Sequence, residues 1–206
     1  MCCYNIDFVE SVSGLTLEPH AIVRIPSLTL TKSKGPSSTC ILRTSTFSSI
    51  TNTPGFYRAL PPQNPADVVS TKSTPDMGVG LFAKRNFKVN EVILSERPLL
   101  IFPSALPSPT TLRGEEAIKY HYSLFEKTLQ QALGTMTKED VDTFMSLSNC
   151  NPNFAQAQGI ANTNAFDTEI DEANRLMGEF GYSAIGKFTS RVNHRCVIWC
   201  LFLKFT

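Results

Sequence analysis

Two short stretches of the 206-residue chain carry residue types that could hold a ligand. In Gly78-Val79-Gly80, a glycine at each end leaves the backbone without Cβ atoms, so that it can approach a bound molecule closely. The second stretch, residues 189–196, includes the adjacent side chains of Asn193 and His194, which could supply fixed polar groups to a ligand. Taken alone, the glycine pair is better explained by a tight β-turn, and a buried imidazole that joins two segments would account for His194.

The first of these stretches lies in a region with the pattern of short β-strands. Strand candidates are residues 67–71, 78–83, 91–98 and 99–102. In the third candidate Val92 and Leu94 share one face, whereas the fourth is continuously apolar, as in a buried strand. Short runs of this kind, bounded by turn residues, predict a small β assembly.

The pattern then changes to that of an amphipathic helix. Between residues 113 and 133, apolar residues recur at spacings of three and four, and Gly134 is expected to end the helix as its C-cap. Tyr120 and His121 lie on the apolar face of this predicted helix. We interpret both as packing residues.

A second helix is predicted immediately after the first. Thr137 is a suitable N-cap and Asp140 stands three positions later, where an acid stabilises the first turn. The expected buried face consists of Val141, Phe144, Met145 and Leu147. Shorter helical segments are expected at residues 154–160 and 169–180. Strands followed by helices predict an α+β fold with a helical insertion.

The first 63 residues have no comparable pattern. Short apolar runs are separated by Ser, Thr, Pro and Gly, and the alternating run at 27–31 is interrupted directly afterwards by a polar segment. So little apolar surface favours a weakly ordered N-terminal extension over residues 1–63.

Composition argues against several classes of partner. The net charge is +1, and Lys84-Arg85 is the only adjacent basic pair in the central region, so direct nucleic-acid binding is not expected. No apolar run approaches the length of a membrane span, about 18 residues, and the N-terminus lacks the features of a targeting peptide. We therefore expect no membrane association and an intracellular location, nucleus or cytoplasm.

The cysteines do not form a zinc-binding pattern. The six cysteines include no C-x-x-C pair, and Cys196 and Cys200 would supply at most two ligands. Ordinary reduced thiols are the favoured interpretation, and no metal site is expected.

Three motifs in order resemble a SET domain. Gly78-Val79-Gly80-Leu81-Phe82-Ala83 and the later run Glu91-Val92-Ile93-Leu94-Ser95-Glu96-Arg97-Pro98 resemble its opening. Residues 159–166 resemble the segment after a helical insertion, and Ser190-Arg191-Val192-Asn193-His194-Arg195-Cys196 resembles the S-R-[IV]-N-H-S-C signature. The region from Asp67 to Cys196 is thus similar to SET-domain protein-lysine methyltransferases, in the branch with a split SET domain that includes the SET-and-MYND proteins and their fungal relatives.

The resemblance implies a fold, a cofactor and a substrate class. The fold would be a partial SET-type β-clip with a helical insertion. The cofactor would be S-adenosyl-L-methionine, contacted by Gly78, Val79, Gly80, Asn193 and His194. The substrate would be a lysine of a protein, with histones among the candidates; the oligomeric state is not predicted.

The resemblance also implies a division of the chain. The predicted SET region spans residues 64–206, after the extension at 1–63. Its parts are the N-terminal SET strands at 67–104, the helical insertion at 110–180, the start of the C-terminal SET part at 181–196, and an aberrant tail at 197–206.

The sequence departs from the family pattern near its end. Arg195 stands where the family has a small serine, and Val197 follows Cys196 in place of a Pro-Asn pair. The later tyrosine motif, the post-SET zinc segment and the MYND module have no counterpart, so we assign no catalytic residue and expect a truncated gene product. The alternative is a non-catalytic SET remnant, either unstable or acting as an interaction module through apolar surface such as residues 99–102.

Overall fold

The structure is a computed structural model that describes most of the chain. It covers residues 20–25, 37–54, 56, 65–76, 78–106, 109, 111–168 and 181–192, and it describes residues 7–8 as backbone alone. In this part of the chain no helix is long and apolar enough to cross a membrane.

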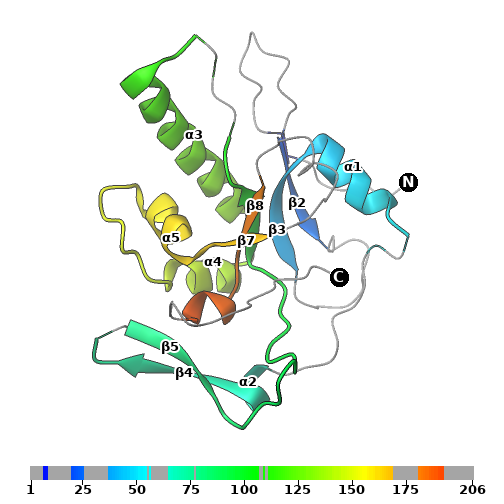
Figure 1. Cartoon of the computed structure of the whole chain (residues 1–206). Helices are drawn as coiled ribbons and strands as arrows, with labels where there is room; N and C mark the ends of the chain where they lie inside the picture. The colour runs from blue at the N-terminus through cyan, green and yellow to red at the C-terminus, as the bar shows by residue number, and fades with distance from the viewer. Residues whose placement is uncertain are drawn as a thin grey trace.

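Within the described residues, six strands form one mixed sheet in the order β1-β2-β3-β6-β8-β7 (Figure 1). They are β1 (Asp7–Phe8), β2 (His20–Ile25), β3 (Ser38–Arg43), β6 (Leu100–Pro103), β7 (Phe166–Thr168) and β8 (Tyr182–Ile185). β3 and β6 run parallel, and the other neighbouring pairs are antiparallel.

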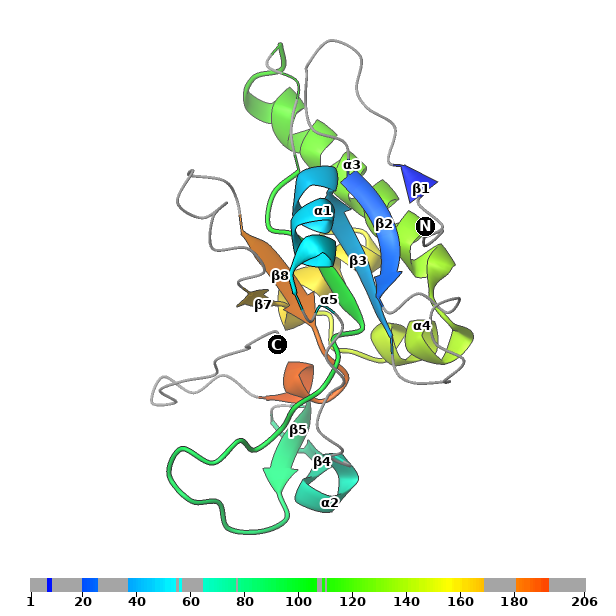
Figure 2. The same cartoon turned by 90° about the vertical axis from the view of Figure 1, so that its right-hand side faces the viewer.

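Helices cover both faces of this sheet, and a separate hairpin lies beyond one end of it (Figures 1 and 2). The helices are α1 (Thr44–Asn52), α2 (Pro65–Val68), α3 (Gly114–Thr135), α4 (Lys138–Met145), α5 (Gln156–Asn164) and the 3₁₀ turn η1 (Thr189–Arg191). The hairpin consists of β4 (Val69–Thr74) and β5 (Gly78–Ala83), which pair in antiparallel fashion.

Alternating side chains of the strands build a core on each face of the sheet, as a period of two requires. Ile22, Ile41, Leu100, Phe102 and Ile185 pack with buried residues of α3, α4 and α5. Ala21, Val23, Cys40, Leu42 and Ile101 form the second cluster, with Phe47 and Ile50 of α1 packed against it. The described residues therefore form an α+β fold, as predicted.

The predicted weakly ordered extension is wrong for residues 20–25 and 37–52. β3 lies in the middle of the sheet, and its residue Ile41 is fully buried. The short apolar runs pair with each other, Ala21 opposite Leu42 and Val23 opposite Cys40, and β3 then pairs with β6, some sixty residues later in the chain. Local composition could not reveal this burial, because it comes from partners that are distant in sequence. The run at 27–31 lies outside the described residues.

The strand predictions around the glycine motif are partly confirmed. β5 and β6 form where expected, whereas β4 begins at Val69, after the short helix α2. The predicted strand at 91–98 is wrong, since this segment has no regular structure. Asn90 has a positive φ of 65°, and Glu91 accepts hydrogen bonds from the Arg85 guanidinium and the Lys88 N–H, so the chain turns back on itself here.

The helix predictions from periodicity are confirmed for α3, α4 and α5. Thr137 caps α4, its hydroxyl accepting a hydrogen bond from the Asp140 N–H at 3.2 Å. Gly134 is not the C-cap of α3, because the helix continues to Thr135 and Met136 caps it. The predicted helix at 169–180 lies outside the described residues.

Candidate functional site

The structure brings together segments that resemble separate SET motifs. β5 lies against η1, the short orange-red helix in Figures 1 and 2, although more than a hundred residues separate them in the chain. We call this region, comprising residues 78–83, 96, 164 and 186–191, the β5–η1 junction. Gly78, Val79 and Gly80 belong to it. Asn193 and His194 come two and three residues after the end of η1 and lie outside the described residues.

A single carboxylate fixes the turn that leads into η1. Glu96 Oε1 accepts hydrogen bonds from the Thr189 N–H at 2.7 Å and the Thr189 hydroxyl at 2.6 Å. The Phe188 N–H lies 3.1 Å and 3.0 Å from the two carboxylate oxygens. Hydrogen bonds to a charged acceptor are stronger than neutral ones, so Glu96 holds residues 188–189 in place.

Gly186 allows this carboxylate to approach so closely. A Cβ atom at position 186 would overlap both the Thr189 hydroxyl and Glu96 Oε1. The Gly186 N–H also donates to the Ser190 hydroxyl at 3.1 Å. The turn between β8 and η1 therefore requires the absence of a side chain at this position.

Ser190 connects η1 to the end of α5. Its hydroxyl donates to the Asn164 carbonyl at 3.0 Å. The Asn164 side chain in turn donates to the carbonyls of Ser148 at 2.6 Å and Ile160 at 2.7 Å. The segment that resembles the post-insertion motif is thereby joined to the S-R-V segment.

Arg191 fastens η1 to the loop after α4. Its guanidinium donates to the Ser146 carbonyl at 3.3 Å and the Ser146 hydroxyl at 3.0 Å. Partial burial lowers the pKa of Arg191 from its usual value. Both partners are neutral oxygens, so this contact serves to orient the segment.

The two glycines of the motif have different structural roles. Gly78 is exposed and has a positive φ of 66°, a conformation that glycine adopts without a steric penalty at the β4–β5 turn. Gly80 is buried inside β5, where Val79 is half-buried. Among the described residues β5 pairs only with β4, so backbone groups on its other edge could hydrogen-bond with a ligand.

The described residues offer no other chemistry at this junction. None of them forms a group of three or more His, Cys, Asp or Glu side chains that could hold a metal ion. Cys40, a free thiol, is buried in the core, and burial raises its pKa to about 12, which makes it a poor nucleophile. The junction is therefore suited to holding a ligand through backbone groups and polar side chains.

Sequence reasoning missed the positioning residues of the junction. Glu96 belongs to the E-x-P part of the opening motif, but its partners are backbone N–H groups and the Thr189 hydroxyl, which leave no charge pattern in the sequence. Gly186 is an isolated glycine, and only the folded turn reveals why it is needed. Comparison of the chain with protein-family models, curated proteins and solved structures gave no match.

Proposed function

We propose that this chain is a SET-type protein that binds S-adenosyl-L-methionine at the β5–η1 junction, and that its class is protein-lysine N-methyltransferase. The observation that carries the proposal is the contact between β5 and η1. The resemblance to SET domains places these two segments in one cofactor site, and in the fold they lie against each other. Chance proximity of segments so far apart is a weaker explanation.

The chemistry of the junction suits one end of the cofactor. Its amino-acid end carries an ammonium and a carboxylate, which pair with backbone C=O and N–H groups such as those on the free edge of β5. Gly80 leaves room for close approach along this edge, and Asn193 and His194 would extend the site from η1. When bound, S-adenosylmethionine would supply a sulfonium methyl group for transfer.

The chain's own residues would act as positioning groups under this proposal. Glu96 and Gly186 set the path of residues 186–191, and Ser190 joins that path to α5. No side chain of the junction is assigned as a catalytic base. The substrate would be a lysine of a protein. An intracellular location, nuclear or cytoplasmic, belongs to the same proposal, because the free thiols of Cys40 and Cys150 suit a reducing compartment.

Isothermal titration calorimetry with the full chain tests the proposal. S-adenosylmethionine and S-adenosylhomocysteine should both bind, and Gly80→Val should abolish binding because its side chain blocks the approach to β5. Glu115→Gln, an exposed change on α3, is the control and should bind as the wild type does. The absence of binding heat for a folded wild-type chain would overturn the proposal.

A second candidate function rests on exposed apolar side chains. Val89, Val92 and Ile93 are 91%, 70% and 47% exposed in the loop that follows β5. Residues 99–102, the surface expected from the sequence for an interaction module, are buried instead, because they form β6 and the residue before it. An interaction module acting through residues 89–93 is the alternative proposal.

A matched comparison separates the two candidates. Affinity purification with the wild type and with a Val89→Ser, Val92→Ser, Ile93→Ser triple variant would identify partners that depend on the loop. A partner held only by the wild type, together with no transfer of labelled methyl groups, would favour the interaction module. Equal recovery of the same partners by the wild type and the triple variant would argue against the interaction module.

A further inference from the structure

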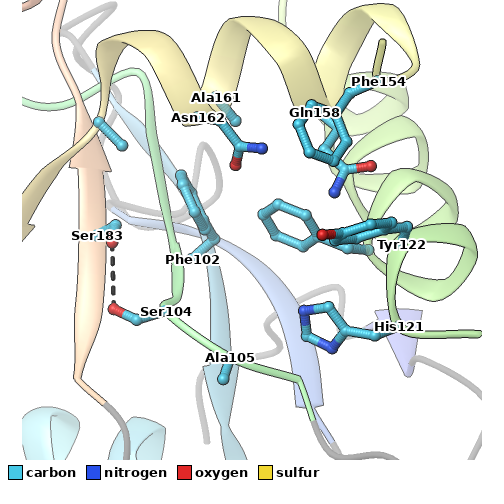
Figure 3. Close-up of a pocket in the computed structure, with 12 residues that line it drawn as sticks. Phe102, Ser104, Ala105, His121, Tyr122, Phe154, Gln158, Ala161, Asn162 and Ser183 are labelled. Atoms are coloured by element: carbon cyan, nitrogen blue, oxygen red, sulfur yellow. Dashed lines mark hydrogen bonds between the residues drawn. The ribbon is translucent and has the colours of Figure 1, made fainter. Parts of the chain in front are cut away.

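A cavity of about 380 Å³ lies between the sheet and helices α3 and α5, away from the β5–η1 junction (Figure 3). Two serines line it: Ser104, which follows β6, and Ser183, which lies near the start of β8. Glu96 and Thr189 lie beyond the opposite ends of the same strands, as the register of Leu100 with Ile185 and of Pro103 with Tyr182 shows. Small-molecule sites have volumes of about 300–1,000 Å³, so this cavity is large enough for a compact ligand.

Aromatic rings form much of the cavity wall. The Tyr122 ring meets the Phe154 ring edge to face, with 5.0 Å between centroids. The His121 ring stacks on Phe125 with an interplanar angle of 19° and 6.3 Å between centroids. Rings already fixed against one another offer a flat molecule a stacking surface without further ordering.

A buried polar side chain points into the same space. Gln158 of α5 is 3% exposed, and it lines the cavity. Its backbone N–H donates to Glu126 Oε2 at 2.8 Å, which fixes its position on the helix. A carboxamide at the cavity surface can donate and accept hydrogen bonds, so it could pair with a polar ligand there.

Asn162 supplies a second carboxamide one turn further along α5. Figure 3 shows the Gln158 and Asn162 side chains directed from the helix into the cavity, across from Tyr122 and Phe102. A carboxamide presents one donor and one acceptor side by side, which matches the hydrogen-bonding edge of a nucleobase.

The charges around the cavity favour an uncharged ligand. Among the described residues, no Lys, Arg, Asp or Glu side chain lines it. Two described carboxylates contact residues that line it: Glu126 accepts from the Gln158 N–H, and Asp167 Oδ1 lies 3.5 Å from the Ser183 hydroxyl. These negative charges would repel a phosphate group.

We propose that this cavity is a binding site for an uncharged nucleobase or nucleoside. The base stacks against the Tyr122 and Phe154 wall, and the carboxamides of Gln158 and Asn162 pair with its polar edge. This site is separate from the proposed cofactor site and does not depend on methyltransferase activity.

Calorimetric titration of the full chain with adenosine, guanosine, cytidine and uridine tests the proposal. At least one nucleoside should bind, and Gln158→Leu should weaken that binding at least tenfold, the effect of losing about 1.4 kcal/mol. Gln131→Leu, an exposed change on α3 outside the cavity, is the control and should have no effect. Gly80→Val should also leave nucleoside binding unchanged, which distinguishes this cavity from the β5–η1 junction.

Two further measurements keep the test decisive. The melting temperature of Gln158→Leu should be close to that of the wild type, so that lost binding cannot be ascribed to unfolding. The 5′-monophosphate of the preferred nucleoside should bind more weakly than the nucleoside itself. The proposal is overturned if no nucleoside binds, if Gln158→Leu binds as well as the wild type, or if the monophosphate binds more tightly.

Discussion

The Glu96 carboxylate accepts a hydrogen bond from the Thr189 N–H at 2.7 Å and so joins segments 93 positions apart in the sequence. The same oxygen accepts a hydrogen bond from the Thr189 hydroxyl. One side chain thereby ties the segment that follows β5 to the turn before η1. The geometry of the β5–η1 junction depends on this carboxylate.

Replacing Glu96 with Gln should destabilise the fold. The neutral amide keeps one acceptor oxygen but directs an NH₂ group at backbone donors, so we expect a loss of about 1–3 kcal/mol in the free energy of unfolding. Urea denaturation followed by circular dichroism measures it. Glu115→Gln, whose side chain is 80% exposed and pairs with Lys119, should change stability by less than about 0.5 kcal/mol. Equal effects of the two substitutions would contradict the role of Glu96.

Two glycine-to-alanine substitutions should change the free energy of unfolding in opposite directions. Gly186→Ala forces a Cβ into the space occupied by Thr189 and Glu96, and overpacking of this kind costs about 1–3 kcal/mol. Gly134→Ala meets nothing within 4 Å and lies inside α3, so it should stabilise by about 0.4–1 kcal/mol. Thermal unfolding of both variants checks the pair. A Gly186→Ala variant as stable as the wild type would show that the turn has another conformation.

Cys40 should make stability depend on pH in alkaline solution. Burial raises its pKa from 9.0 to about 12, and the nearby Arg97 charge opposes the shift only in part. Above pH 9 the unfolded thiol loses its proton while the folded one keeps it, so stability falls as pH rises from about 9 towards 12. The decrease in the free energy of unfolding that is due to this thiol approaches about 1.4 kcal/mol per pH unit.

Replacing each cysteine separately isolates the contribution of Cys40 to this pH dependence. Cys40→Ala should lose the corresponding part of the alkaline slope, although it is less stable at neutral pH because its side chain is smaller. Cys150→Ala, at an exposed free cysteine, should keep the wild-type slope. Denaturant unfolding at pH 8, 9 and 10 measures all three chains. Parallel curves for the wild type and Cys40→Ala would mean that this thiol is not shielded from solvent.

The N-cap of α4 offers a local test of the helical insertion. Thr137→Ala removes the hydroxyl that accepts from the Asp140 N–H, at a cost of about 0.5–2 kcal/mol. Thr143→Ala, in the same helix, loses only a bond to the Glu139 carbonyl four residues earlier and should cost less. Equilibrium denaturation compares the two. A larger loss for Thr143 would contradict the capping role of Thr137.

Local sequence patterns predicted the helices well and the central strands poorly. α3 and α4 have apolar spacing and a capping threonine within a single stretch of chain, so their signals are local. The burial of Ile41 depends on β6, which comes much later, and no window around residue 41 contains that information. Alternation of Val92 and Leu94 suggested a strand, but residues 91–98 have no regular structure, and hydrogen bonds to Glu91 from Arg85 and Lys88 hold the turn just before them.

In the candidate sites too, local motifs could be predicted from the sequence, whereas features that depend on packing could not. The glycine motif was visible in sequence, yet only the structure separates the turn role of Gly78 from the buried position of Gly80. His121 was interpreted as a packing residue, and it does stack on Phe125, but it also lines the cavity. The orientation of Gln158 could not be predicted, because it depends on how α5 packs against α3.

Hydrogen exchange followed by mass spectrometry tests the central claim most directly. With saturating S-adenosylhomocysteine, amides in β5 and η1 should exchange more slowly, whereas those in α3 should be unchanged. Protection in both segments, lost in Gly80→Val, is the result that the β5–η1 junction predicts. Unchanged exchange in β5 and η1, or protection confined to another part of the chain, would contradict it.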